Sequence, residues 1–296
     1  MDIALLTRGP GLYSTRRLRE SAEARGHRVD MIDHTRCVLL LDSYGAKLLM
    51  NGRFHEVPDV IIPRIGASVT TLGASVIDHY DLMGVPSLTS SRGLRLARDK
   101  WRCQQLLVSA GIDSPATLLA SDPAEARKCA RTLGKYPLVV KMLEGTHGIG
   151  VSLVHNRYQL EHTCDGFLRF QPQVLIQEYI KEASGSDLRI FMVGDRIVAA
   201  MERRARRGEF RANMHLGATA TIADLSKEEK ALALRVVELL GLEVAGVDIL
   251  RSKRGPLVME VNASPGLEGI ETTTGVDIAG AIIELAEEKA RLSLSA

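Results

Sequence analysis

The chain has few cysteines and no long hydrophobic run, and both absences limit what it can be. Its four cysteines, among 296 residues, show no C-x-x-C spacing, which gives no support for a disulfide framework or a zinc site. No apolar stretch approaches the roughly 18 residues of a membrane span. The first residues, with Asp2 followed by IALL, are typical of a buried strand rather than a signal peptide. We therefore expect a cytoplasmic protein with no membrane partner.

An excess of charge of one sign is also lacking. The 38 lysines and arginines nearly balance the 36 aspartates and glutamates, which gives a net charge of +2 at pH 7. The average field is therefore weak, and direct binding of nucleic acid is not indicated. Hydrophobic residues make up 45% of the chain, which is ample for a buried core. The length suggests about two domains on a scale of ~150 residues each.

Residues 1–95 show strands that alternate with a helix. The apolar runs predict strands at 2–7, 28–33 and 60–63 and a helix at 14–25. This alternation predicts an open parallel sheet covered by helices. In such sheets ligands bind outside the carboxyl ends of the strands, where Arg8 and Arg64 lie. From the pattern alone, a substrate contact and a solvated loop arginine are equal alternatives for both residues.

Two further units follow, at residues 96–182 and 183–296. A long helix predicted over 91–110, which carries Lys100, leads into a second α/β block, and the pattern turns antiparallel from Asp187. The remaining predicted elements are helices at 122–133, 157–170, 227–240 and 276–292 and strands at 137–142, 174–179, 188–193 and 196–203. The fold class is therefore α/β, with α+β character in the C-terminal part.

Three oxygen-bearing side chains near the C-terminus predict a metal site. Glu260 and Asn262 are two residues apart in the string VMEVNASPG, so in a strand they face the same side. Asp248 lies in the apolar run LEVAGVDILR, and the turn-like residues 252–256 would bring the next strand back beside it. Two carboxylates and an amide oxygen on a rigid sheet suit Mg²⁺ or Mn²⁺ carrying nucleotide phosphates. The alternative is a pair of strands with polar residues facing water.

A glycine-rich segment and two lysines predict phosphate binding. The segment EGTHGIGV contains Gly145, Gly148 and Gly150, and glycines let backbone N–H groups approach phosphate oxygens. It matches neither the Walker loop nor the dinucleotide fingerprint, and alone it is equally typical of a structural turn. Lys141 strengthens the interpretation, because a lysine in the apolar strand PLVVKML needs an anionic partner. Lys100 offers a second cation.

These blocks, together with IALLTRG, PRIG, ARDK, QEYIKEA and AGVDILR, resemble the RimK family of ATP-grasp ligases almost from Met1 to the last helix. The resemblance implies an ATP-grasp fold with an N-terminal parallel-sheet domain. It implies an ADP-forming ligase that uses ATP and Mg²⁺ or Mn²⁺, with two ions expected. The substrates it implies are L-glutamate and the C-terminal tail of a small-subunit ribosomal protein, joined through an acyl phosphate. It also implies synthesis of poly-α-glutamate, and we expect a homo-oligomer.

The resemblance assigns roles to individual residues as well. The residues it assigns to ATP binding are Lys100, Lys141, Gly145, Gly148, Gly150, Glu178, Tyr179, Asp187, Arg211 and Asn213. Those it assigns to catalysis are Arg189, Arg203 and Arg211. It assigns the metal to Asp248, Glu260 and Asn262, and the substrate to Arg8 and Arg64. In this assignment the strand end at Glu178 reads adenine through backbone groups and the Glu178 side chain. From the pattern alone, a cross-strand surface ion pair is the favoured interpretation of Asp187 and Arg189.

The stretch ERRARRGEFRAN, residues 202–213, is unusually rich in arginine. Such a run is typical of a solvated face or an RNA-binding patch. Because Arg203, Arg211 and Asn213 are assigned to phosphate groups, we interpret Arg204, Arg206 and Arg207 as an electrostatic funnel for an acidic protein tail. The chain departs from the family nearby, at Leu216 and Ala218, where RimK proteins commonly have arginine and glycine. Acceptor recognition could differ for this reason.

Two other functions compete with the RimK-type reaction. One is a related ATP-grasp ligase with a small-molecule or carrier-protein acceptor, as in lysine biosynthesis or cofactor glutamylation. The other is a non-catalytic module that binds ATP and signals by closing. The intact metal trio and the two lysines argue against the second, because pure binding would tolerate their loss.

Overall fold

The structure, a computed structural model, describes residues 1–143 and 150–294. Its N-terminal sheet has the strand order β2-β1-β6, and both pairings are parallel. The elements of this part are β1 (Asp2–Leu6), α1 (Tyr13–Ala24), β2 (Arg28–Ile32), β6 (Val60–Pro63) and α2 (Thr70–Leu82). β1 and β6 are almost entirely buried, as expected for parallel strands covered on both faces. The predicted open parallel sheet is confirmed.

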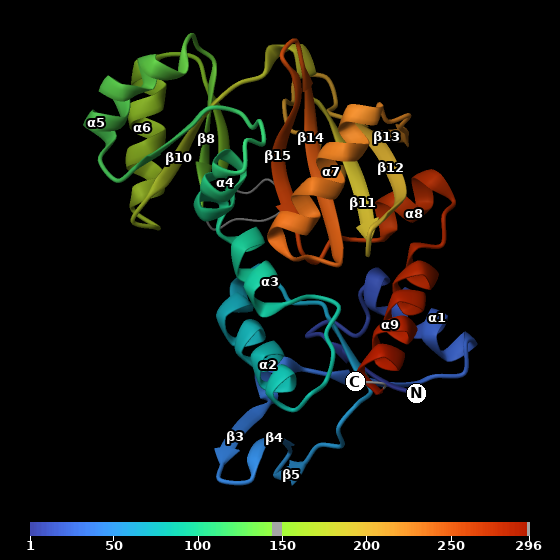
Figure 1. Cartoon of the computed structure of the whole chain (residues 1–296). Helices are drawn as coiled ribbons and strands as arrows, with labels where there is room; N and C mark the ends of the chain where they lie inside the picture. The colour runs from blue at the N-terminus through green and yellow to red at the C-terminus, as the bar shows by residue number, and fades with distance from the viewer. Residues whose placement is uncertain (144–149, 295–296) are drawn as a thin grey trace.

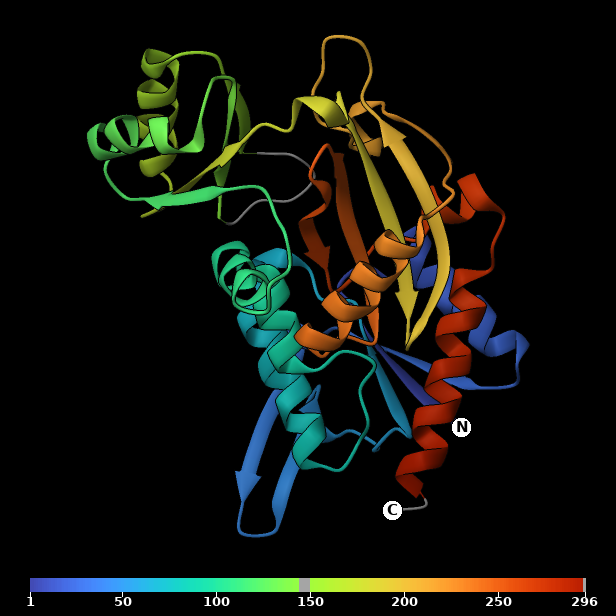
Figure 2. The ribbon, with the colours of Figure 1, turned by 45° about the horizontal axis from the view of Figure 1, so that its top comes forward.

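A second, smaller sheet projects from this part of the molecule (Figures 1 and 2) and was not predicted from the sequence. It consists of the antiparallel strands β3 (Val38–Asp42), β4 (Gly45–Met50) and β5 (Arg53–Phe54). Leu48 of β4 is buried in the core that α2 also joins. The strands are short, and the turns between them use positive φ at Gly45 and Asn51.

The prediction of one long helix over 91–110 is wrong, because this segment forms two helices. These are α3 (Ser91–Arg98) and α4 (Lys100–Ser109). Asp99 separates them with an extended backbone, φ −87° and ψ 94°. Its carboxylate accepts hydrogen bonds from the N–H groups of Trp101 and Arg102, at 3.1 and 3.0 Å, and so caps α4. The break places Lys100 in the first turn of α4.

The next sheet stands apart from the rest of the molecule (Figures 1 and 2). Its strand order is β7-β10-β8-β9, all antiparallel. The elements are β7 (Thr117–Ala120), α5 (Pro123–Cys129), η3 (Ala130–Leu133), β8 (Leu138–Met142), β9 (Val151–Val154), α6 (Arg157–Leu168) and β10 (Val174–Glu178). The sequence predicted that the antiparallel pattern starts at Asp187, but it starts earlier in the chain. This unit has a core of its own, with Val140, Leu160 and Ile176.

The C-terminal sheet carries five antiparallel strands in the order β13-β12-β11-β14-β15. The elements are β11 (Ser186–Val193), β12 (Arg196–Arg204), β13 (Thr219–Ile222), α7 (Lys227–Leu240), β14 (Val244–Ser252), β15 (Gly255–Asn262), α8 (Glu268–Thr274) and α9 (Ile278–Leu294). A capping box of Ser226 and Glu229 starts α7. The two large cores of the molecule join this sheet to the N-terminal sheet, and α9 lies beside α1 (Figure 1).

Together these elements place the carboxyl ends of β1 and β6, the start of α4 and the strands β14 and β15 around one region. The separate sheet of β7–β10 faces this region (Figure 2). No helix among the described residues is long and apolar enough to cross a membrane.

Candidate active site

The hairpin of β14 and β15 brings the predicted metal ligands together. Asp248 is the cross-strand partner of Glu260, and Asn262 pairs with Gly246, two residues along. The side chains of Glu260 and Asn262 are partly exposed, and neither has a hydrogen-bond or ion-pair partner among the described residues. A carboxylate and an amide held on a rigid sheet without partners are suited to a hard cation. Glu260 and Asn262 therefore fit a divalent metal, whereas Asp248 is already paired with two arginines, and the metal role of the three residues stays a prediction.

The described residues contain no group of three or more His, Cys, Asp or Glu side chains that could hold a metal. The predicted set is compatible with this finding, because it has two carboxylates and one amide. Mg²⁺ in particular is bound by one or two protein carboxylates together with substrate phosphates and water.

Asp248 belongs to a buried chain of charges that crosses three neighbouring strands. Its carboxylate forms ion pairs with both Arg189 on β11 and Arg203 on β12. Arg189 Nη2 lies 2.7 Å from Asp248 Oδ2, and Arg203 Nη2 lies 2.9 Å from the same oxygen. Arg203 Nε also donates to Asp187 Oδ1 at 2.6 Å. Two aspartates and two arginines therefore alternate across the sheet.

In this row of charged side chains, burial and the ion pairs shift the pKa values in opposite directions. Burial raises the pKa of Asp187 to about 6, although Arg203 opposes the rise. Burial acts in the same direction on Asp248, but Arg189 and Arg203 outweigh it and hold the pKa of Asp248 below its usual value. The carboxylates in turn raise the pKa of the Arg203 guanidinium against the effect of its own burial. Asp248 thus stays ionised at neutral pH, as a metal ligand must.

Two lysines from different elements lie close to each other, and Lys141 lies near Glu260 and Asp248. Lys141, on β8, donates to Gln177 Oε1 at 2.7 Å, and Lys100, at the start of α4, donates to the carbonyl of Leu143 at 2.9 Å. Burial, together with the charge of Lys100, lowers the pKa of Lys141 to about 8, although the carboxylates of Glu260 and Asp248 oppose the shift. A buried, cation-rich place beside a carboxylate is suited to the phosphates of a nucleotide.

We expect ATP binding to be coupled to protonation of Lys141. In the free protein its pKa of about 8 leaves much of the ammonium deprotonated above that pH, and nearby phosphates would raise the pKa again. Binding at about pH 8.5 should therefore take up a larger fraction of a proton than binding at about pH 7. Calorimetry in buffers of different ionisation enthalpy measures this uptake.

The Lys141→Met variant is the control for this expectation. It should remove the proton uptake and weaken ATP binding by at least ~10-fold. It should not weaken folding at neutral pH, because the native pKa lies below the unfolded value and the charged form costs stability there. Unchanged uptake in the variant would show that another group takes up the proton.

The end of β10 is held by contacts that the sequence did not predict. The carboxylate of Glu178 accepts a hydrogen bond from the N–H of Ala116 at 2.7 Å and forms an ion pair with Arg254, in the turn between β14 and β15. The backbone N–H of Glu178 donates to the carbonyl of Ala116. The side chain predicted to read adenine is thus already engaged, whereas Tyr179 follows directly and lies outside β10. Arg254 lies in a run of turn residues that carried no functional signal.

The arginine-rich segment divides into paired and exposed members. Arg211 binds the neighbouring Glu209, with Nη2 to Oε2 at 2.7 Å, and Asn213 caps a short helical turn by accepting from the N–H of His215. Arg206 and Arg207 are exposed, as the proposed funnel requires. The departures from the family, Leu216 and Ala218, lie at the end of this short turn and just before β13.

The arginine at the carboxyl end of β6 is partly buried rather than fully solvated. Arg64 donates to the carbonyl of Pro265 at 2.7 Å, and Arg98, at the end of α3, donates to the carbonyl of Ile65 at 2.7 Å. Arg8 is exposed and donates to Ser68 Oγ at 3.0 Å. Arg98 was not predicted from the sequence, although its position in the string ARDK, two residues before Lys100, is a signal that could have indicated it.

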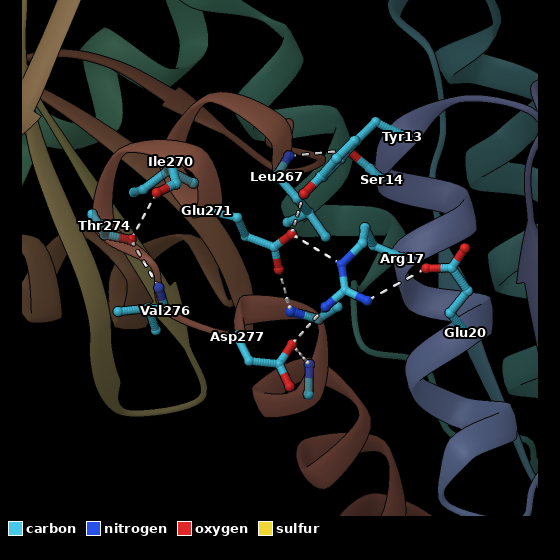
Figure 3. Close-up of polar contacts among 12 residues, drawn as sticks. Tyr13, Ser14, Arg17, Glu20, Leu267, Ile270, Glu271, Thr274, Val276 and Asp277 are labelled. Atoms are coloured by element: carbon cyan, nitrogen blue, oxygen red, sulfur yellow. Dashed lines mark hydrogen bonds and ion pairs between the residues drawn. The ribbon is translucent and has the colours of Figure 1, made fainter.

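The loop that follows the metal strand is fixed to the N-terminal helix α1 (Figure 3). The N–H of Leu267 donates to Ser14 Oγ at 3.0 Å. Behind it, Glu271 of α8 accepts from Tyr13 Oη at 3.0 Å and from Arg17 Nε at 3.4 Å (Figure 3). The segment between Asn262 and α8 is therefore held to α1 at the end that leads into α8.

Two of the predicted phosphate-binding glycines, Gly145 and Gly148, lie outside the described residues. Gly150 is described and has a positive φ of 72°. A Cβ atom built there would lie 2.5 Å from the sulfur of Met142, so both the backbone angle and the close packing favour glycine at this position.

Two family models cover nearly the whole chain. The RimK PreATP-grasp domain matches residues 1–94, and the RimK-like ATP-grasp domain matches residues 97–286. The chain belongs to the RimK-like ATP-grasp family. Its relatives include a probable alpha-L-glutamate ligase 1 of Hahella chejuensis, 48% identical over 98% of this chain and 96% of the relative. A probable alpha-L-glutamate ligase of Azotobacter vinelandii is 48% identical over 100% of this chain and 98% of the relative.

Solved structures agree on the fold. The ATP-grasp ligase PsnB complexed with minimal precursor superposes with a TM-score of 0.76 at 22% identity, covering 97% of this chain and 98% of PsnB. D-alanyl-alanine synthetase A from Vibrio cholerae gives a TM-score of 0.76 at 16% identity, covering 98% of each chain. The fold is therefore ATP-grasp, as predicted. By family, the RimK-like protein is an ADP-forming, ATP-dependent carboxylate–amine ligase.

Proposed function

We propose that this RimK-like ligase adds L-glutamate to the C-terminus of a small-subunit ribosomal protein. The observation that carries the proposal is the meeting of Lys100 and Lys141 with Glu260, whose carboxylate has no ion-pair partner in the described part of the chain. This arrangement can hold a nucleotide polyphosphate and a cation beside a substrate carboxylate. The choice of glutamate follows the names of the relatives, which are probable alpha-L-glutamate ligases.

The chemistry requires a carboxylate to become a good electrophile. In the proposed reaction its oxygen attacks the γ-phosphorus of ATP, ADP leaves, and the α-amine of glutamate then displaces phosphate from the acyl phosphate. Asp248, Glu260 and Asn262 would hold a divalent metal, Mg²⁺ or Mn²⁺, and two ions are expected. The metal would stabilise the negative charge on the transferred phosphoryl group. A solved PsnB complex contains Mg and ADP, which supports a metal–nucleotide pair in this fold.

The remaining charged residues have supporting roles in this proposal. Lys100 and Lys141 hold the phosphates, and Arg189 and Arg211 stabilise charge at the reacting centre. Arg203 is revised from a phosphate contact to a positioning residue, because its guanidinium bridges the buried carboxylates of Asp187 and Asp248, whereas among the described residues Arg189 and Arg211 each pair with a single carboxylate. Adenine binds the backbone at the end of β10, near Tyr179, while Glu178 fixes the hinge through Ala116 and Arg254.

The acceptor tail would enter between the N-terminal domain and the C-terminal sheet. We propose the units 1–95, 96–182 and 183–296, with the middle unit closing over ATP and the first unit, through Arg8 and Arg64, facing the tail. Arg206 and Arg207 would attract it, since a tail that gains glutamates becomes more negative. We also propose a homo-oligomer that acts in the cytoplasm.

Mass spectrometry of the acceptor after incubation with ATP, Mg²⁺ and glutamate tests this function. We expect mass increments of one or more glutamates and fragment ions that place them at the C-terminus in α-peptide linkage. Because each product again ends in glutamate, the enzyme should act repeatedly and should slowly condense free glutamate into poly-α-glutamate. Glutamates on side-chain γ-carboxylates, or none at the C-terminus, would contradict the proposal.

A second candidate is a ligase with a small-molecule or carrier-protein acceptor. Leu216 and Ala218 favour it, because they replace the residues that RimK proteins commonly have close to the proposed acceptor path. The two candidates differ in one measurement. ADP release that needs glutamate but does not respond to any ribosomal protein tail would favour the small acceptor.

A further inference from the structure

Arg64 and Arg98 form a pair of partly buried arginines beside the proposed metal site. They come from different elements, the end of β6 and the end of α3. Each donates one hydrogen bond of 2.7 Å to a backbone carbonyl, Arg64 to Pro265 and Arg98 to Ile65. The charge of Arg98 helps to lower the pKa of Arg64, which indicates that the two guanidinium groups lie close to each other.

Neither guanidinium has a carboxylate partner among the described residues. Arg98 Nε is buried and makes no hydrogen bond there, and the same is true of Ser264 Oγ, next to Pro265. Burial lowers the pKa of Arg64 to about 10, and the charge of Arg98 adds to the effect. Two cations held together without a counter-ion are costly unless an anion binds them.

Other arginines of the chain have carboxylate partners that compensate their charge. Arg203 has Asp187 and Asp248, and Arg251 has Glu229 at 2.7 Å. Arg64 and Arg98 differ from these because, within residues 1–143 and 150–294, their guanidinium groups contact carbonyl oxygens and no carboxylate. Their incomplete pairing therefore points to a ligand that brings its own negative charge.

The surroundings limit what that ligand can be. The carboxylate of Glu260 is close enough to oppose the lowering of the pKa of Arg98 that burial causes. Pro265, which accepts from Arg64, belongs to the loop that follows the metal strand and that Leu267 fixes to Ser14. An anion on these arginines would thus lie next to the place of phosphoryl transfer, on the side of the N-terminal domain.

We propose that Arg64 and Arg98 bind a carboxylate of a glutamyl substrate that is not itself activated. The inference rests on the proposed ligase function and deepens it. A planar guanidinium pair matches carboxylate geometry, and a carboxylate clamped between two fixed arginines is not free to attack ATP. Both the incoming glutamate and a glutamate at the end of the acceptor carry such a spectator carboxylate, and the experiment separates these two sources.

The test compares Arg98→Ala and Arg98→Lys with the wild-type enzyme at saturating ATP. We expect Arg98→Ala to raise KM by about 10- to 100-fold for the substrate whose carboxylate is bound, with KM for ATP unchanged. Arg98→Lys keeps the charge without the planar fork and should recover part of the loss. A raised KM for glutamate identifies the incoming amino acid, and a raised KM for the acceptor identifies its terminal residue.

Arg95→Ala is the matched control. Arg95 lies on the same helix, is exposed and pairs with Asp78 at 2.8 Å, so its removal should leave both KM values unchanged. A second readout is thermal stabilisation by glutarate, a dicarboxylate without an amine, measured for each variant against its own ligand-free melting temperature. Stabilisation should be present in the wild type and lost in Arg98→Ala.

Unchanged KM values for both substrates in Arg98→Ala, together with unchanged stabilisation by glutarate, would overturn the proposal. A lower melting temperature with unchanged KM values would overturn it too, because it would show a structural role alone. Failure of the proposed function is distinguishable from both. A wild-type enzyme that releases no ADP with glutamate would refute the ligase assignment, while the glutarate measurement would still test the arginine pair.

Discussion

Glu260→Gln should reduce turnover by at least ~100-fold while the protein stays folded. Glutamine keeps the shape of the side chain and removes its charge. Glu260 has no partner among the described residues, so the substitution breaks no ion pair of the fold. What it removes is the negative charge that would hold a metal against the phosphates, and such electrostatic contributions amount to several kcal/mol of transition-state stabilisation.

The measurement is ADP release with saturating substrates and a titration of Mg²⁺. In Glu260→Gln the Mg²⁺ concentration for half-maximal rate should rise, since one anionic ligand is gone. Glu268→Gln is the matched control, because Glu268 is an exposed carboxylate at the start of α8 and should leave rate and Mg²⁺ dependence unchanged. Near-normal turnover in Glu260→Gln would remove the metal assignment from this hairpin.

The parts of the site that the sequence predicts are those set by local geometry. Asp248 and Glu260 lie on consecutive strands joined by a short turn, so spacing and turn composition were enough to place them opposite each other. Lys141 was found for a similar reason, since a lysine within one apolar strand is visible without knowledge of its neighbours.

The parts that the sequence did not predict depend on contacts between distant segments. Asp187 and Arg203 meet Asp248 because β11 lies between β12 and β14, an order that strand periodicity does not reveal. Arg98 reaches Ile65 from a helix whose end is set by Asp99, and the sequence pattern continued the helix through that residue. Partner choice across a sheet or between domains follows from packing, which a pattern of apolar residues leaves open.

The second large effect is expected for Arg203→Met, on stability rather than on chemistry alone. Arg203 is 8% exposed and bridges Asp187 and Asp248. Its removal leaves the buried carboxylates of Asp187 and Asp248 close to each other, with one positive charge fewer to balance them. Loss of one partner from a buried ion-pair network costs about 3–5 kcal/mol. The free energy of unfolding from urea denaturation should fall by that amount at about pH 8.

Arg204→Met is the control, because Arg204 follows on the same strand but is exposed, and surface substitutions of this kind change stability by about 0.5 kcal/mol or less. The effect of Arg203→Met should also depend on pH in a definite direction. Without the guanidinium the pKa of both carboxyls rises, and Asp187 already titrates at about 6 in the wild type. The native variant therefore binds protons more readily than the unfolded chain, and its deficit should shrink as the pH falls from about 8 to about 5.

Adding Asp187→Asn to Arg203→Met should recover part of the lost stability at about pH 8, because it removes one of the two stranded charges. The same recovery should be absent at about pH 5, where protonation has already neutralised much of that charge. A double-mutant cycle on the two residues measures their coupling directly. An equal deficit at both pH values would show that Arg203 stabilises the sheet through packing of its side chain, and that the buried carboxylates remain compensated by Arg189 alone.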